Sequence, residues 1–155
     1  MARETINAMK KKNFSLDEAQ RLLPVMESLL RTSMESKRRI EEIEEEFKKI
    51  NHSVFLRGGM HLNIVTLSRL RAESDKAIQR VKDAMAEIES IGALVKDLDI
   101  GLIDFPCVVD GNTVLLCWKM GEQRITHWHG TNEGFSARKP IDDRIARAGK
   151  AKKAN

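Results

Sequence analysis

Apolar side chains recur every three or four residues along most of the first ninety positions. Over residues 16–50 they form one stripe, and the same spacing resumes over residues 64–91. This period is typical of amphipathic helices, so it predicts a first helix over about 15–51 and a second over about 60–91. The pair Gly58-Gly59 interrupts the pattern, and two helices joined by a short loop pack antiparallel with their stripes facing, as in a coiled-coil hairpin.

Local signals mark the ends of these helices. Ser15 is followed three residues later by Glu18, a capping-box pattern that predicts a helix start. Pro24 lacks an N–H and its ring crowds the preceding turn, so it predicts a kink, with the main helix running from there to about Asn51. Gly92 follows the last apolar position of the second stripe and predicts its C-terminal cap.

Residues 101–129 change to the alternation that is typical of β-strands. Asp110-Gly111 separates two such runs and is a strong hairpin signal, and Gly121-Glu122 separates the second run from a third. The pattern therefore predicts a three-stranded antiparallel β-meander, with residues 93–100 as a connector. The fold class is α+β: a long antiparallel helical hairpin, kinked near Pro24, packed on this meander.

Two-residue turns at both hairpins assign every strand residue to one face of the sheet. The more apolar face, which we expect to pack on the helices, holds Ile103, Phe105, Cys107, Val109, Val114, Leu116, Trp118, Met120, Ile125, His127 and His129. The other face holds Asp104, Pro106, Val108, Thr113, Leu115, Cys117, Lys119, Thr126 and Trp128. The two cysteines fall on opposite faces, so they form no disulfide, and we interpret both as small buried apolar residues.

Charge divides the chain into a body and two basic ends. Residues 1–13 carry a net charge of +3 and residues 138–155 carry +5, so that residues 14–137 carry −4. We expect flexible segments at 1–13 and 141–155 around a single domain over 14–140. Since no apolar run reaches the ~18 residues of a membrane span and no leader pattern opens the chain, the predicted location is the cytoplasm, with no membrane partner.

His127-Trp128-His129 is the one pattern with metal-binding character. Two histidines at positions i and i+2 of a strand point the same way and can share a zinc ion. Such a site needs a third ligand, for which Asp104, Glu133 or a histidine of the helical loop are candidates. The alternative is structural: one histidine hydrogen-bonded in the core and the other at the margin of the sheet. No cofactor is predicted.

Several motifs together resemble an uncharacterised bacterial family, the domain-of-unknown-function family 2203. The motifs are Phe14-Ser15-Leu16-Asp17-Glu18-Ala19 with Leu22-Leu23-Pro24, Val95-Lys96-Asp97-Leu98-Asp99, Gly101-Leu102-Ile103-Asp104-Phe105-Pro106, Cys117-Trp118-Lys119-Met120-Gly121-Glu122, Trp128-His129 and Gly134-Phe135. The resemblance implies a small bacterial protein without an assigned activity, and its motif positions here are Asp104, Trp118, His129, Phe135 and Arg138. Family members commonly carry an aromatic residue in place of His127 and a glutamine in place of Lys139, which argues against a site that needs His127.

These patterns favour three functions in turn. The first is a non-catalytic interaction or scaffold protein that acts through the hairpin as a homodimer, or with another protein, because the apolar stripes outrun the sheet. The second is an enzyme with a metal or small-ligand site near His129, where Asp104, Glu133 and Arg138 could gather. The third is nucleic-acid binding through phosphate contacts of the basic C-terminal tail.

Overall fold

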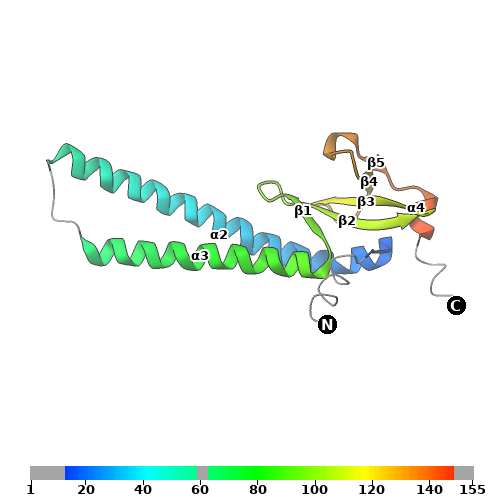
Figure 1. The fold of residues 1–155 in the computed structure, drawn as a ribbon, viewed down its shortest axis with the longest axis horizontal. Helices are drawn as coiled ribbons and strands as arrows, with labels where there is room; N and C mark the ends of the chain where they lie inside the picture. The colour runs from blue at the N-terminus through cyan, green and yellow to red at the C-terminus, as the bar shows by residue number, and fades with distance from the viewer. Residues whose placement is uncertain (1–12, 59–62, 149–155) are drawn as a thin grey trace.

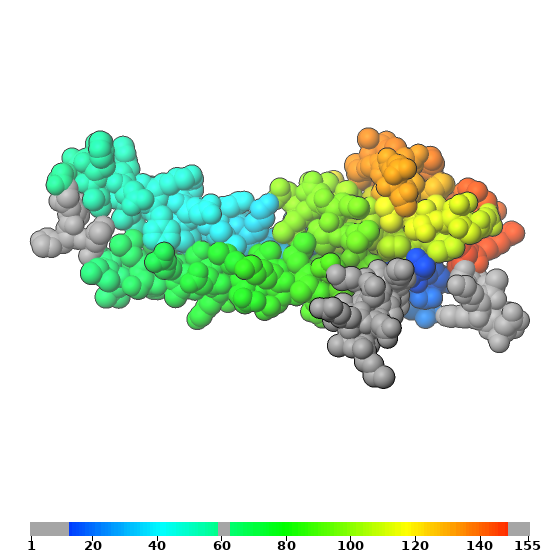
Figure 2. Space-filling view, in the orientation of Figure 1, coloured from blue at the N-terminus to red at the C-terminus, as the bar shows by residue number. Residues whose placement is uncertain are grey.

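The computed structural model describes residues 13–58 and 63–148. Two long helices lie side by side, and an antiparallel sheet packs against one end of the pair (Figure 1). Beyond the sheet both helices project in the same direction, and they move apart toward their far end (Figure 1 and Figure 2). In the described part of the chain, no helix combines the length and the apolar character needed to cross a membrane.

The two predicted helices are present, and both are capped. Helix α2 spans Leu16–Leu56, and the Ser15 side chain accepts a hydrogen bond from the Glu18 N–H at 3.2 Å. Helix α3 spans Ile64–Ile91 and ends at Gly92, whose φ of 108° gives the left-handed cap that glycine favours. Helix α2 is not interrupted at Pro24: it continues through the exposed proline as one helix of 41 residues.

The sheet has five strands rather than the predicted three. Their order is that of the chain: β1 (Leu94–Asp97), β2 (Leu102–Val109), β3 (Asn112–Lys119), β4 (His127–Gly130) and β5 (Lys139–Pro140). The prediction missed β1 because its residues were assigned to a connector, and it missed β5 because that strand has only two residues. Both added strands are short edges, where alternation is too brief to recognise in the sequence.

The first hairpin has the predicted register. Val109 lies opposite Asn112, and Phe105 lies opposite Leu116. Asp110 and Gly111 have φ angles of 51° and 79°, the positive values that a two-residue turn of this kind requires. Cys107 and Cys117 therefore lie on opposite faces of the sheet, and both are free thiols.

The second hairpin has a different register from the predicted one. Leu116 lies opposite Trp128 instead of His127, because the connection between β3 and β4 is longer than two residues. Glu122 stabilises this longer loop: its carboxylate accepts the Lys119 N–H at 2.7 Å, and its carbonyl accepts the Trp118 indole N–H at 2.8 Å. A shift of one residue exchanges the faces of a strand. His127 and His129 consequently lie on the face opposite to the expected one, and Trp128 joins the core.

The main core lies between one face of the sheet, the start of α2 and the end of α3. Phe14 shows how the layers are joined: its N–H donates to the Pro106 carbonyl at 2.7 Å, and its ring meets the Phe105 ring edge to face. The short helix α4 (Asp143–Arg147) adds the buried Ile145 to this core. Residues 143–147 are thus part of the fold, contrary to the expected flexible tail from 141, while 149–155 and 1–12 lie outside the described residues.

Further from the sheet, the helices pack through a narrow seam. Its buried side chains are mostly small, which lets the helix backbones approach closely: Ser33, Ser36, Ile43, Leu70, Ala77 and Ala84. A charged cluster reinforces this seam, since the Arg39 guanidinium donates to both carboxylate oxygens of Glu73 at 2.7 and 3.0 Å. The apolar stripes therefore cover each other along most of the hairpin, and bulky apolar side chains become strongly exposed at its far end.

Gly101 is the position where the fold depends most directly on a glycine. Its φ is +70°, and an added Cβ would lie 2.6 Å from the Met120 Cβ. We expect Gly101→Ala to lower the free energy of unfolding by more than the ~1–2 kcal/mol of a left-handed alanine alone. Gly111→Ala is the matched control, because its φ is +79° but nothing lies within 4 Å of the added atom. Urea unfolding of both variants measures the difference, and equal losses would contradict the steric account.

Candidate functional site

Asp104 and His129 form a buried polar contact on the sheet face that points away from α2. Asp104 comes from β2 and His129 from β4, and the carboxylate Oδ2 lies 3.0 Å from the imidazole Nε2. Asp104 has no exposed surface, and His129 is 3% exposed. The segment between β4 and β5 lies on this same side of the sheet (Figure 1). The pair is therefore excluded from bulk water. Buried polar groups need hydrogen-bond partners within the protein.

The hydrogen bonds of His129 orient its ring toward Asp104. His129 Nδ1 lies 2.8 Å from the Gly130 carbonyl, which can only accept, so Nδ1 carries a proton. The other ring nitrogen, His129 Nε2, faces Asp104 Oδ2. The second carboxylate oxygen, Asp104 Oδ1, is buried and has no hydrogen-bond partner within the described chain. This oxygen is an unused acceptor inside the fold.

Cys117 lies beside the pair because it is directly opposite Asp104 in the β2–β3 register. Burial, followed by the negative charge of Asp104, raises the pKa of the Cys117 thiol to about 11. A hydrogen bond between the thiol and the Asp104 carboxylate acts in the same direction, and Arg138 opposes it. A thiol with this pKa is protonated at neutral pH and is a poor nucleophile. Asp104, Cys117 and His129 each offer one donor atom, and these atoms lie within 4.8 Å of one another.

Arg138 connects this cluster to the surface. Its guanidinium packs over the Phe135 ring, 4.4 Å from the centroid, and donates to the two Glu122 carboxylate oxygens at 3.1 and 3.4 Å. Burial alone would raise the pKa of Glu122, but the hydrogen bonds from Arg138 and the Lys119 N–H outweigh it and lower that pKa. Arg138 thus contacts the cluster through Cys117 and holds the β3–β4 loop through Glu122.

The structure brings together four of the five site residues that the family resemblance indicated. Asp104, His129 and Arg138 surround Cys117, and Phe135 stacks on Arg138. Trp118 is separate: its ring is in the core on the other face.

The paired-histidine interpretation is not supported by the geometry. His127 lies on the same face as His129, but its Nδ1 is 2.8 Å from the Thr126 hydroxyl, and it is outside the group of close donor atoms. Glu133, another candidate ligand, accepts the Gly130 N–H at 2.9 Å and pairs with Lys139. Of the loop histidines, His52 is at the far end of the hairpin and His61 lies outside the described residues. Cys117 was missed, although the first hairpin register already placed it opposite Asp104.

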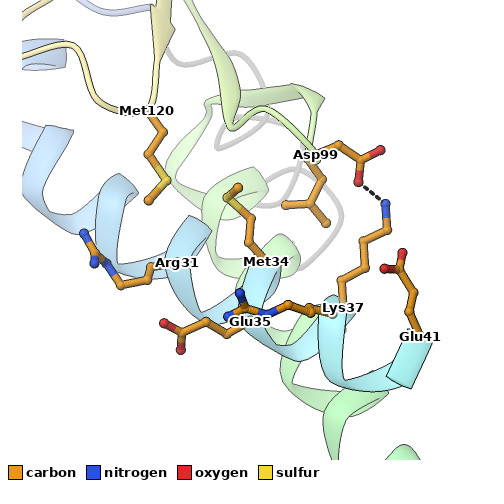
Figure 3. Close-up of a pocket in the computed structure, with 9 residues that line it drawn as sticks. Arg31, Met34, Glu35, Lys37, Glu41, Asp99 and Met120 are labelled. Atoms are coloured by element: carbon orange, nitrogen blue, oxygen red, sulfur yellow. Dashed lines mark hydrogen bonds and ion pairs between the residues drawn. The ribbon is translucent and has the colours of Figure 1, made fainter. Parts of the chain in front are cut away.

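A hollow of about 380 Å³ lies at the surface between α2 and the turn after β1, apart from the buried cluster (Figure 3). Met34, Leu98 and Met120 supply apolar side chains, and charged residues of α2 surround them. Lys37 reaches across and pairs with Asp99, and this bond raises the pKa of the lysine. The charge of this lysine is therefore compensated by its partner.

Comparison with protein-family models places most of the described chain in one family. The sequence model of a family described as "Uncharacterized conserved protein (DUF2203)" matches residues 12–141. Neither the comparison with curated proteins nor that with solved structures yields a match. The match supports the resemblance found in the sequence motifs and carries no information on activity.

Because of the Asp104–His129 contact, we expect substitution of His129 to cost much more stability than substitution of His127, the other histidine of β4. His129→Gln removes the imidazole from a buried carboxylate, and we expect a loss of roughly 3 kcal/mol in the free energy of unfolding. His127→Gln, at a partly exposed position of the same strand, is the control and should change stability little. Thermal and urea unfolding of both proteins test this, and similar losses would show that the buried contact has no special weight.

Glu122 predicts a pH dependence of stability. Its pKa is lowered in the folded protein, so its stabilising contribution is present above the ordinary glutamate value and is lost as the pH falls through the lowered one. We expect Glu122→Gln to be less stable than the wild type at neutral pH, with the difference shrinking in acid below about pH 4.5. Glu87→Gln, at an exposed position of α3, is the control. A difference that is constant across pH would contradict this assignment.

Proposed function

The chain belongs to the uncharacterized conserved family DUF2203, and we propose that it is a non-catalytic interaction protein that acts through its helical hairpin as a homodimer. The observation that carries this proposal is the far end of the hairpin, the tip. There Phe55, Leu56, Ile64 and Val65 are each between 68% and 81% exposed. Bulky apolar side chains clustered on a projecting element are typical of contact surfaces.

The tip is also strongly basic. Residues 47–58 and 63–72 include five lysines and arginines and no aspartate or glutamate: Lys48, Lys49, Arg57, Arg69 and Arg71. The neighbouring segment of α2, residues 41–46, has five glutamates. Two tips would repel each other, but a tip placed beside residues 41–46 of a second copy would meet the opposite charge.

In an antiparallel arrangement of two hairpins, each basic tip can lie on the acidic segment of the other copy. From Glu41 to Leu56 is ~23 Å along the helix, so two hairpins that overlap over this length place each tip on the acidic segment of the other. This contact is isologous, as in most dimers. Two helices are ~20 Å wide, so the overlap covers about 1,000 Å² in total, the low end for a specific interface. The dimer is therefore reversible and concentration-dependent.

The chemistry of the sheet supports a non-catalytic role for the chain. The Cys117 thiol is buried and its pKa is raised, so it is not an activated nucleophile. Two charged pairs lie at the surface of this part of the sheet, Glu122 with Arg138 and Glu133 with Lys139. Both cysteines are free, and we place the protein in the cytoplasm of a bacterium, where thiols stay reduced.

Val65→Asp tests the dimer. The substitution puts a charge into the apolar tip, and we expect it to shift the monomer–dimer equilibrium toward the monomer by at least tenfold. Ile100→Asp is the matched control, since Ile100 is 40% exposed in a turn near the sheet. Sedimentation equilibrium and light scattering over a concentration series measure the dissociation constant.

Salt provides a second readout for the same dimer. Because opposite charges face each other in the antiparallel arrangement, raising the ionic strength should weaken the association. A wild-type protein that stays monomeric at high micromolar concentration would overturn the proposal. So would a Val65→Asp variant that dimerises as strongly as the wild type.

A further inference from the structure

We propose that Asp104, Cys117 and His129 form a binding site for a divalent transition metal of the zinc class. The proposal is independent of the hairpin interface, because the site is in the sheet. It rests on three observations: the identity and closeness of the three donor atoms, the orientation of His129 by its second nitrogen, and the unpartnered oxygen of Asp104.

The donor set is one that zinc takes in proteins. A thiolate, an imidazole nitrogen and a carboxylate oxygen are its three common ligand types, with bonds of ~2.0–2.3 Å. The three donor atoms here lie within 4.8 Å of one another. Ligands of one tetrahedral ion are separated by ~3.3–3.8 Å at those bond lengths. Small rotamer adjustments of the three side chains are therefore enough to converge on one ion.

His129 is held as a ligating histidine usually is. Its Nδ1–H donates to the Gly130 carbonyl at 2.8 Å, which leaves Nε2 directed at Asp104 and Cys117. Ligating histidines commonly donate their other nitrogen to a backbone carbonyl or a carboxylate, which fixes the tautomer and the ring. Gly130 is itself fixed, because its N–H donates to Glu133 at 2.9 Å.

The third observation concerns Asp104. A hydrogen bond to His129 accounts for only one of its two carboxylate oxygens. Its side chain is fully buried, and Oδ1 has no hydrogen-bond partner in the described chain. A buried carboxylate oxygen without a partner is costly. Coordination of an ion by this carboxylate would remove that cost.

The charges of the three ligands suit a divalent ion. A carboxylate and a thiolate together neutralise the charge of an M²⁺ ion, and a neutral imidazole adds no charge. The ion and its three ligands would therefore be neutral inside the sheet. Three protein ligands leave a fourth position for water or a small ligand.

Cobalt(II) is a suitable probe because it takes zinc sites and reports a cysteine ligand through a sulfur-to-metal charge-transfer band. We expect the purified full-length protein to bind one cobalt ion per chain with this band, and zinc to displace it. Cys117→Ala should lose the band and weaken zinc binding by at least a hundredfold. Cys107→Ala is the matched control, since Cys107 is buried in the same sheet but on the opposite face, and it should keep the band.

A folded wild-type protein without the band would overturn the proposal, and so would a band that survives in Cys117→Ala or disappears equally in Cys107→Ala. Circular dichroism establishes the folding of each variant. Where Cys117→Ala does not fold, the wild type decides: zinc should raise its melting temperature and a chelator should reverse the rise, and no rise would overturn the site.

Discussion

Strand pairing between β3 and β4 is the constraint on which the rest of the domain depends. With Leu116 opposite Trp128, the indole of Trp128 joins the apolar layer over α2. His129 then falls on the other face, next to Asp104 and Cys117. One residue of slippage would bury both histidines of β4 against the helices and expose the tryptophan. Hydrogen bonds of Glu122 stabilise the loop that gives this register. The Glu122 carboxylate therefore contributes to placing the polar side chains of β4 on the face opposite to the helices.

The two faces of the sheet differ in composition and in what they contact. The face toward α2 is apolar and joins the strands to both long helices, with Phe14 and Ile145 completing it from the two ends of the domain. The other face holds a small polar cluster, buried by the segment around Phe135 and Arg138. The proposed contact surface, at the tip of the hairpin, is far from both. The proposed self-association and the proposed metal binding can therefore be tested separately.

Much of the fold could be predicted from the sequence because its signals are local. The apolar period, the caps at Ser15 and Gly92, and the turn at Asp110-Gly111 each depend on neighbouring residues, and each is confirmed. The second turn could not be predicted in the same way. Its length depends on hydrogen bonds that Glu122 makes with Lys119 and Arg138, residues whose proximity only the folded sheet establishes.

The candidate site shows the same limit. Asp104, His129, Phe135 and Arg138 were identified from family motifs, but the grouping around Cys117 was not, because it needs both hairpin registers to be correct. Pro24 is a separate case. A proline inside a helix predicts a kink or a break, and α2 continues through Pro24 without a break.

The seam of small residues and the Arg39–Glu73 bridge tie α2 and α3 together in a fixed alignment. An insertion or deletion in one helix alone would move every later residue out of line with its neighbour. Only matched changes in both helices, in steps of ~7 residues or two turns, would preserve the facing surfaces. A longer or shorter hairpin that keeps this alignment would therefore change both helices by the same number of turns and leave the sheet unchanged.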